Sequence, residues 1–284
     1  LRRLGRSMGY RNETELVEQW QRHRVAVRRL HEKLFYRPLL NAVARLDSGD
    51  ARLSLEAASE RLTALGYLDP DGALRHIEAL SSGISRRAAI QRTLLPVLLG
   101  WFADAPNPDV GLLGFRRVSE ELGGTPWYLR LLRDESETAE RLAHLLSASR
   151  LATDLLLRAP EVVGLLSDVK ELEPKSLEDL LREMSATAMR YDEPDRAVQA
   201  IRTVRSRELF RVAAADANGL LGVPGVCQAL SDISDATISV ALQIAVASVE
   251  ATLGSSLPTR FSVIAMGRLG GQDVGYSSDA DAIF

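Results

Sequence analysis

The sequence predicts a mainly α-helical protein followed by the start of an α/β region. Before Arg260, apolar residues recur at spacings of three and four, which places them on one side of a helix. From Arg260 to Phe284, two short apolar runs flank a glycine-rich turn. We therefore expect a series of amphipathic helices that leads into a strand–turn–strand unit.

The first predicted element is one long helix over residues 12–47, which Pro38 kinks or interrupts. Asn12 and Glu15 form the pattern of a capping box, with an oxygen acceptor at the start and a carboxylate three residues later. Ser48-Gly49-Asp50 then ends this unit.

Shorter helices are expected to follow. Proline stands where a first helical residue would lie at several of them. The segment 105–108, Ala-Pro-Asn-Pro, is the clearest loop. The predicted helices are 54–66, 70–80, 84–103, 111–123, 126–133, 136–147, 149–158, 160–167, 176–190, 194–219 and 224–253, and the last is expected to pack on the following strand.

Composition narrows the functional classes. The 284 residues carry a net charge of −3, whereas a nucleic-acid-binding protein is normally basic. The single cysteine, Cys227, excludes a disulfide within the chain and fits a cytoplasmic setting, and we expect it to be a small buried residue. The longest apolar run, 94–103, is too short to span a membrane. Because the chain starts at Leu1 and stops within a strand-like run, we expect it to be an internal segment of a longer protein.

The C-terminal 25 residues carry the candidate site. Val263, Ile264 and Ala265 are expected to form a buried strand, and the glycines after it permit backbone conformations that a side chain would block. Asp279 and Asp281 alternate on the second predicted strand and therefore share one face. Two carboxylates so close repel each other unless a cation lies between them, and a divalent ion that also holds a nucleotide is the expected partner.

Other residues complete this candidate site. Arg268 adds a cation, and Ser277 and Ser278 add hydroxyl groups just before the carboxylates. The glycines do not match a phosphate-binding P-loop, because no Gly-Lys-Ser/Thr follows them, and they do not form a dinucleotide fingerprint. The alternative interpretation is a hairpin that has no binding function and carries two aspartates on its surface. The co-occurrence of glycines, serines and paired aspartates favours a site.

At these residues the sequence resembles a known family. Gly267 followed by Asp279-Ala280-Asp281 resembles the DNA polymerase β-type nucleotidyltransferase superfamily. The fuller pattern, in which Gly267-Arg268-Leu269-Gly270-Gly271 is followed by Gly275-Tyr276 and Ser278-Asp279-Ala280-Asp281, resembles the bifunctional glutamine synthetase adenylyltransferase/adenylyl-removing enzymes. The resemblance implies the truncated start of an α/β polymerase β-type nucleotidyltransferase domain at the C-terminus.

The resemblance extends upstream and implies a domain division. Residues 26–40 resemble the segment that closes the first half of the actinobacterial enzymes, and 207–212 resemble the helix before each catalytic strand. The implied ranges are 1–48 for the end of the adenylyl-removing half, 49–220 for a helical linker or regulatory region, and 221–284 for the start of the second nucleotidyltransferase domain.

The resemblance also implies an activity. Enzymes of this kind transfer AMP from ATP to a tyrosine of glutamine synthetase in one half and remove it in the other, and PII-type signal proteins regulate some of them. By resemblance, Asp279 and Asp281 ligate Mg²⁺ and are catalytic, while Gly267, Arg268, Gly270, Gly271, Ser277 and Ser278 form the nucleotide pocket. A further carboxylate is expected beyond Phe284.

Some features depart from the family pattern. Asp273 stands where the family usually has Glu, and Ser277-Ser278 resembles the removing half whereas Gly275-Tyr276 resembles the transferring half. The candidate site lies after the segment that resembles the end of the first half, and this position favours its assignment to the adenylyl-transferring half. The alternative is a helical regulatory scaffold beside a nucleotidyltransferase domain with a different substrate.

One group of arginines has two possible interpretations. Arg202, Arg205, Arg207 and Arg211 are expected on one helix, where Arg207 and Arg211 share a face. They could contact triphosphate or glutamine synthetase. The favoured interpretation is a solvated face paired with Glu208.

Overall fold

The computed structural model describes residues 2–31, 34, 55–122 and 126–284. The chain divides into two compact units, Leu1–Ala148 and Ser149–Phe284. The functional ranges 1–48, 49–220 and 221–284 stay predictions, because a compact unit is defined by its contacts and not by its activity. The helical prediction is confirmed, since helices make up most of the described residues.

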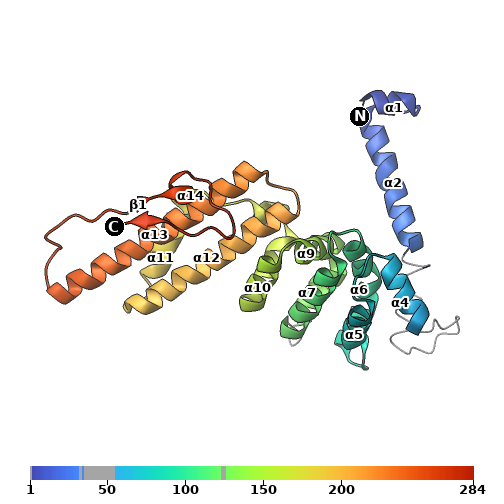
Figure 1. Ribbon diagram of the computed structural model, residues 1–284, viewed down its shortest axis with the longest axis horizontal. Coiled ribbons are helices and arrows are strands. Elements are labelled where there is room, and N and C mark those ends of the chain that lie inside the picture. The colour runs from blue at the N-terminus through green and yellow to red at the C-terminus, as the bar shows by residue number, and fades with distance from the viewer. Residues whose placement is uncertain (1, 32–33, 35–54, 123–125) are drawn as a thin grey trace. The chain divides into compact units, whose positions relative to one another are not determined.

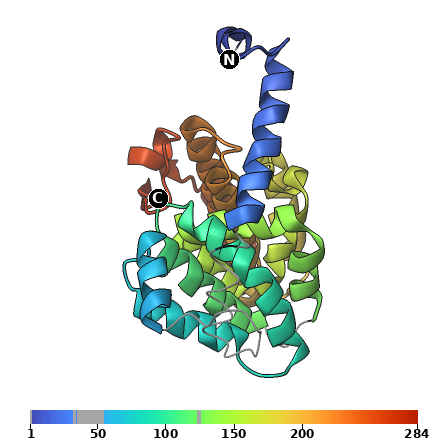
Figure 2. The same cartoon turned by 90° about the vertical axis from the view of Figure 1, so that its right-hand side faces the viewer.

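The first unit is a set of packed helices (Figure 1). In Figure 2 the neighbouring helices α5, α6, α7 and α9 lie against one another, and they share a core of Leu, Phe and Tyr side chains. The described helices of this unit are α1 (Arg2–Ser7), α2 (Glu13–His31), α4 (Leu55–Ala64), α5 (Pro70–Ser81), α6 (Arg86–Ala103), α7 (Pro108–Glu121), α8 (Pro126–Asp134) and α9 (Ser136–Ala148).

Helix starts in this unit follow capping rules. The Asn12 side chain accepts a hydrogen bond from the Glu15 amide at 2.8 Å, which confirms the first bond of the predicted capping box. The Glu15 carboxylate accepts from the Arg11 amide rather than from Asn12. The predicted continuation of this helix toward residue 47, with the kink at Pro38 and the boundary at residues 48–53, lies outside the described residues.

One predicted loop was wrong at its end. Pro108 belongs to α7 and not to a loop, because Asn107 caps the Val110 amide at 3.1 Å and a proline at the first helical position loses no helical hydrogen bond. Residues 160–167 form a helix as predicted, and this helix, η3, is of the 3₁₀ type, with no side-chain cap at Ala159.

The second unit packs three long helices side by side (Figure 1), and its core joins side chains of all three to the segment after them. Ser176 caps the Asp179 amide at the start of the first of these helices, as predicted. The elements of this unit are α10 (Arg150–Arg158), η3 (Pro160–Ser167), η4 (Val169–Leu172), α11 (Leu177–Ala188), α12 (Pro194–Ala217), α13 (Val223–Leu253), β1 (Ile264–Ala265), α14 (Gly267–Gly270) and β2 (Ala282–Ile283).

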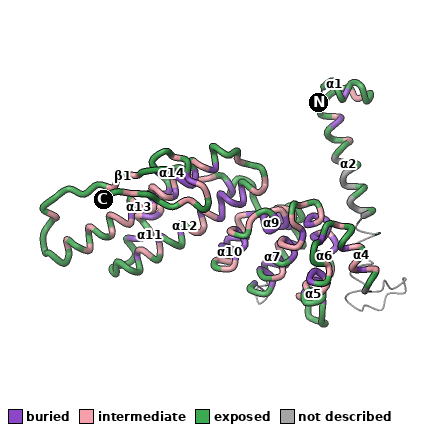
Figure 3. Tube along the Cα trace, viewed as in Figure 1, coloured by how far each residue is buried: buried purple, intermediate pink, exposed green. Residues whose placement is uncertain are grey.

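Helix α13 changes character along its length. Every buried residue of α13 lies between Val226 and Val240. Figure 3 shows its C-terminal end as exposed or intermediate. Among the described helices, α13 alone is long and apolar enough to cross a membrane, by length and composition only. A helix of a soluble protein that packs on its neighbours passes the same test, so this finding carries no conclusion about a membrane.

The C-terminal hairpin differs in detail from the prediction. The strands are only two residues long and pair antiparallel, with Ile264 opposite Ile283 and Ala265 opposite Ala282. Val263 lies outside β1, and Ile264 is 57% exposed, so the prediction of a buried strand was wrong. The apolar run 263–265 predicted a strand buried on both faces. Within the described chain, α11, α13 and α14 cover one face of β1, and no other element covers the opposite face.

Candidate functional site

The glycine-rich segment folds as one short helix followed by a tight loop. The Met266 amide donates to the Asp281 carbonyl at 2.8 Å, which adds one bond to the β1–β2 pair. Gly267 then starts α14, and the amides of Gly270 and Gly271 donate to the carbonyls of Met266 and Gly267. These two glycines therefore contribute backbone shape, since their own N–H groups are already bonded.

Glycine is required at two positions of this turn. Gly267 has a φ of +52°, and a Cβ built on it would lie 2.6 Å from Oδ2 of Asp281. A Cβ on Gly270 would lie 2.5 Å from the carbonyl oxygen of Ala265. Both distances are shorter than real Cβ contacts, so only glycine lets α14 approach β1 and the Asp281 carboxylate.

Asp279 and Asp281 lie at the exit of this loop. Asp281 directly precedes β2 and Asp279 lies two residues earlier, so neither is inside the strand in which it was predicted. Both side chains are exposed. Neither carboxylate forms a hydrogen bond or ion pair within residues 2–31, 34, 55–122 and 126–284.

Arg268 braces the loop from within. Its Nε donates to the carbonyl oxygen of Asp273 at 2.8 Å, and Nη2 lies 3.7 Å from the Asp273 carboxylate. The thiol of Cys227, on α13, hydrogen-bonds to the same carboxylate, and this bond raises the pKa of Cys227 above its ordinary value. Cys227 is half-buried rather than fully buried as expected. The guanidinium of Arg268 remains largely exposed and is available to an anion.

The two serines have different roles in the loop. The Ser278 hydroxyl accepts from the Gly275 amide at 2.9 Å, and the Ser278 amide donates to the Gly275 carbonyl at 3.0 Å. Ser278 thus closes a local turn immediately before Asp279. Ser277 is exposed beside it.

The loop is anchored on α13. The side chains of Leu269 and Val274 are buried in the core of the second unit. Gln272 has a φ of 54° and is the non-glycine residue in the described chain with a positive φ. Its amide nitrogen donates to Oδ2 of Asp235 at 3.1 Å, and its oxygen accepts from Gln228. These contacts place α13 against the loop, and of the predicted packing of this helix on the strand, Ala265 of β1 packs against the same core.

The donor set fits a magnesium ion. Mg²⁺ in nucleotide sites is typically held by one or two carboxylates, with phosphates and water as the other ligands. Asp279 and Asp281 supply that number, they are unpaired, and Gly267 leaves the Asp281 oxygen uncovered. Within the described residues there is no group of three or more His, Cys, Asp or Glu that could hold a metal.

Two arginines of α12, Arg207 and Arg211, belong to a cluster of charged side chains, whereas Arg202 and Arg205 are exposed, as the prediction of a solvated face expects. We define the charge cluster as Lys175, Glu183, Arg207, Glu208 and Arg211. Glu208 is nearly fully buried and bonds Arg211 at 2.7 Å, Arg207 at 3.0 Å and Lys175 at 3.4 Å. Pairing with Glu208 was predicted correctly, but solvation of Arg211 was not, because its side chain is only 7% exposed. The cluster is therefore a structural feature of the core.

Burial and ion pairing act in opposite directions at Glu183. Burial alone would raise the pKa of Glu183, but hydrogen bonds from Lys175 and Arg207 outweigh it and hold that pKa below the ordinary glutamate value. Glu183 on α11 thereby bonds to Arg207 on α12 and joins the two helices.

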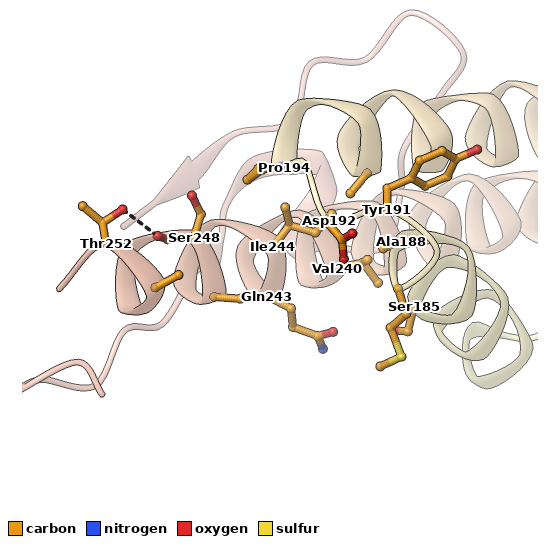
Figure 4. Close-up of a pocket in the computed structure, with 14 residues that line it drawn as sticks. Ser185, Ala188, Tyr191, Asp192, Pro194, Val240, Gln243, Ile244, Ser248 and Thr252 are labelled. Carbon is orange, nitrogen blue, oxygen red and sulfur yellow. Dashed lines mark hydrogen bonds between the residues drawn. The ribbon is translucent and has the colours of Figure 1, made fainter. Parts of the chain in front are cut away.

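One cavity of the second unit lies away from this loop. It has a volume of about 610 Å³ and is lined by the end of α11, the start of α12 and the C-terminal part of α13. Figure 4 shows Tyr191, Asp192, Gln243 and Ile244 around it. None of the predicted site residues lines it, so cavity size alone does not locate the candidate site.

A sequence model of the glutamate-ammonia ligase adenylyltransferase family matches residues 139–284. This match covers half of the chain and includes the glycine loop and both aspartates. The chain belongs to the glutamate-ammonia ligase adenylyltransferase family.

Relatives within this family share the printed name bifunctional glutamine synthetase adenylyltransferase/adenylyl-removing enzyme. The protein of Streptomyces coelicolor is 57% identical over 301 residues, which cover 100% of this chain and 30% of the relative. The protein of Cutibacterium acnes is 50% identical over 284 residues, again 100% of this chain and 28% of the relative. That of Mycobacterium tuberculosis is 44% identical over 278 residues, 95% of this chain and 27% of the relative. The chain thus spans under a third of the length of these relatives.

Two contacts of this glycine-rich loop were not foreseen from the sequence. The Tyr276 hydroxyl donates to Oδ2 of Asp216 at 3.0 Å, and Gln272 is held in its left-handed conformation by α13. Sequence signals exist for the second, since Gln272 directly follows two glycines. Asp216 lies 60 residues before Tyr276, and nothing local in the sequence indicates their contact.

Proposed function

We propose that this chain carries the nucleotide-binding start of an adenylyl-transferring domain, which moves AMP from ATP to a tyrosine of glutamine synthetase. The observation that carries the proposal is the pair of exposed, unpaired carboxylates at the loop exit, Asp279 and Asp281, of which Asp281 lies beside Gly267. The relatives' printed names supply the expected reaction and target.

In this proposal the domain begins as an α/β polymerase β-type nucleotidyltransferase. The antiparallel β1–β2 pair and the packing of α13 against it support that assignment. The ranges 1–48, 49–220 and 221–284 keep their proposed roles as the end of a removing half, a linker and the start of the second catalytic domain.

Each residue of the loop has a proposed task. Asp279 and Asp281 would hold Mg²⁺, which when bound neutralises charge on the phosphate oxygens. Arg268, with an exposed guanidinium braced by Asp273, binds a phosphate group. Ser277 offers a hydroxyl, and Ser278 holds the turn that orients Asp279. Gly267 and Gly271 shape the backbone, and Gly270 keeps α14 against Ala265, which leaves room for the nucleotide.

Asp281→Asn tests the proposal in the family-length protein. Loss of one metal-binding charge removes several kcal/mol of transition-state stabilisation, so AMP transfer from α-labelled ATP to glutamine synthetase should fall by roughly a thousandfold. The matched control is Asp195→Asn, an exposed aspartate in the first turn of α12. Transfer at the control's rate by the Asp281 variant would overturn the proposal.

The same variant decides which half this is. If phosphate-dependent removal of AMP from modified glutamine synthetase is lost while transfer persists, the domain is the adenylyl-removing one. That outcome would support the resemblance of Ser277-Ser278 over that of Gly275-Tyr276, and the transferring assignment would be wrong.

A second function concerns the first compact unit, Leu1–Ala148. Its helices have a core of their own, separate from the unit that bears the loop, which favours a scaffold that receives a regulator such as a PII-type protein. Deleting residues 55–148 should leave basal transfer and abolish regulation by that protein. The deletion must stop before Ser149, where the second unit begins, because α10 packs on α12 within that unit. A cytoplasmic location is part of this proposal, since glutamine synthetase is the target.

A further inference from the structure

The segment from Gly275 to Ala280 is the least supported part of the loop. It connects Val274, which is buried, to Asp281, whose carbonyl pairs with Met266. None of its six residues is buried. Its internal bonds join Ser278 to Gly275, but these bonds do not attach the segment to the rest of the unit.

Within the described chain, one polar contact ties this segment to a long helix. The Tyr276 hydroxyl donates to Oδ2 of Asp216 at 3.0 Å. The bond is charge-assisted, and such bonds are shorter and stronger than neutral ones. Partial burial of the hydroxyl and the Asp216 carboxylate both raise the pKa of Tyr276, which favours the protonated hydroxyl that donates to Asp216.

Asp216 lies on a firmly held part of α12. The residues just before it, from Phe210 to Ala215, are all buried, and they include Arg211 of the charge cluster. After it, Asn218 donates from its side chain to the Ala214 carbonyl, and Gly219 ends the helix with a φ of +69°. The contact therefore joins a weakly held loop to a rigid support.

We infer that Tyr276 and Asp216 form a positioning latch, in which α12 fixes the segment that presents Ser278 and Asp279 to the nucleotide and its metal. This inference rests on the proposed function. Neither residue touches the reacting atoms. Loss of the latch should loosen residues 275–280 without unfolding the unit, because Leu269, Val274 and Gln272 still anchor the loop on α13.

The test is a double-mutant cycle with Tyr276→Phe, Asp216→Asn and the double variant in the family-length protein. Misplacement of a metal-binding group by a fraction of an ångström costs activity, so each single variant should lose roughly tenfold in kcat/KM for ATP. The double variant should lose no more than either single variant, because both remove one bond. The Mg²⁺ concentration for half-maximal transfer should rise in all three variants.

The control is Tyr191→Phe. Tyr191 is exposed to a similar degree but lies at the cavity in Figure 4, and its hydroxyl forms no hydrogen bond within the described residues. It should transfer AMP as the wild type does. Additive losses in the cycle, or an unchanged Mg²⁺ requirement, would overturn the latch while leaving the proposed function intact.

A second readout is independent of activity and uses the 284-residue chain. Spectrophotometric titration of the tyrosines, with Tyr276→Phe to identify the relevant signal, should show a lower pKa for Tyr276 in Asp216→Asn. Hydrogen exchange of amides 275–280 should accelerate in Tyr276→Phe, while exchange in α13 stays unchanged. Unaltered exchange in both regions would refute the latch. A wild-type protein without any transfer activity would instead refute the proposed function.

Discussion

The charge cluster and the glycine loop place charged side chains in opposite environments. In the cluster, the Glu208 and Arg211 side chains are 2% and 7% exposed and are paired with each other. At the loop exit, the Asp279 and Asp281 carboxylates are exposed and have no partner in the described chain. Charged side chains that pair with one another are part of the core, whereas exposed carboxylates without a protein partner are available to a ligand.

The difference predicts where substitutions should act. Removing one member of a buried ion pair leaves the other as an uncompensated charge, which costs stability. Removing an exposed and unpaired carboxylate leaves no buried charge without a partner. Such a substitution should therefore change the activity and not the stability. Substitutions that give the reverse result would invalidate this division.

The largest stability effect is expected for Glu208→Ala. It leaves the buried Arg211 guanidinium without its carboxylate, and breaking a buried pair in this way costs about 3–5 kcal/mol. Urea unfolding, with hydrogen exchange in α12 as the local probe, measures this loss of free energy of unfolding.

The matched control for Glu208 lies on α11. Glu178 pairs with Arg182 four residues along the helix, but its side chain is 84% exposed. Because water screens such a pair, Glu178→Ala should change stability very little. Equal destabilisation by Glu208→Ala and Glu178→Ala would show that the burial of an ion pair does not determine its contribution to stability.

Gly267→Ala should show most clearly that the glycine loop affects activity whereas the charge cluster affects stability. The new methyl group would force an alanine into a left-handed conformation, at about 1–2 kcal/mol, and would collide with Oδ2 of Asp281. We expect AMP transfer to fall by at least roughly tenfold through displacement of the carboxylate, while the unit stays folded.

Gly254→Ala provides the comparison for that substitution. Gly254 has a φ of +68° and nothing within 4 Å of a built Cβ, so it carries the same backbone strain without the collision. Its variant should lose similar stability and keep its activity. Loss of activity in both variants would attribute the effect to strain rather than to Asp281.

The charge cluster was only partly predictable from the sequence, and so was the loop. Helix spacing indicated the pairing of Arg211 with Glu208, which lie three residues apart and share a face, but not that of Arg207, which is adjacent to Glu208. It could not indicate that Lys175 and Glu183 complete the cluster, because those residues come from another part of the chain. Burial of Arg211 depends on that tertiary packing.

In the loop, the glycines and aspartates were recognisable, but their support was not. The pattern identified Gly267 and Asp281, and the structure brings them into contact. The burial of the two short strands was overestimated, because an apolar run does not show whether another element covers its second face. The Tyr276–Asp216 contact joins residues 60 apart, which no local rule can foresee.

Acid should weaken the charge cluster. The pKa of Glu183 is below its unfolded value, so the stability it contributes is present above that unfolded value, about 4.3. That contribution is lost as the pH falls through the lower folded value. In Glu183→Gln, the free energy of unfolding of the second unit should therefore depend less steeply on pH below about 4.3 than in the wild type.

The exposed Glu173→Gln variant should retain the wild-type pH dependence, because Glu173 is outside the cluster. Chemical unfolding at a series of acidic pH values measures the three slopes. A wild-type slope in Glu183→Gln would show that Lys175 and Arg207 do not stabilise the carboxylate.

The smallest effect is expected at Gln272, where the loop stores backbone strain. Gln272→Gly and Gln272→Ala both remove the hydrogen bonds to Asp235 and Gln228, so they differ mainly in the ease of adopting a φ of 54°. Glycine adopts positive φ freely, whereas alanine pays a steric cost, so the glycine variant should be the more stable by about 1 kcal/mol. The difference between their urea midpoints measures this quantity directly, because the lost side-chain contacts cancel. An alanine variant as stable as the glycine variant would mean that the loop relaxes to negative φ once its bonds to α13 are gone. In that case the left-handed turn would be imposed by α13 and not by the local backbone, and the loop would resemble the charge cluster in depending on tertiary contacts for its shape.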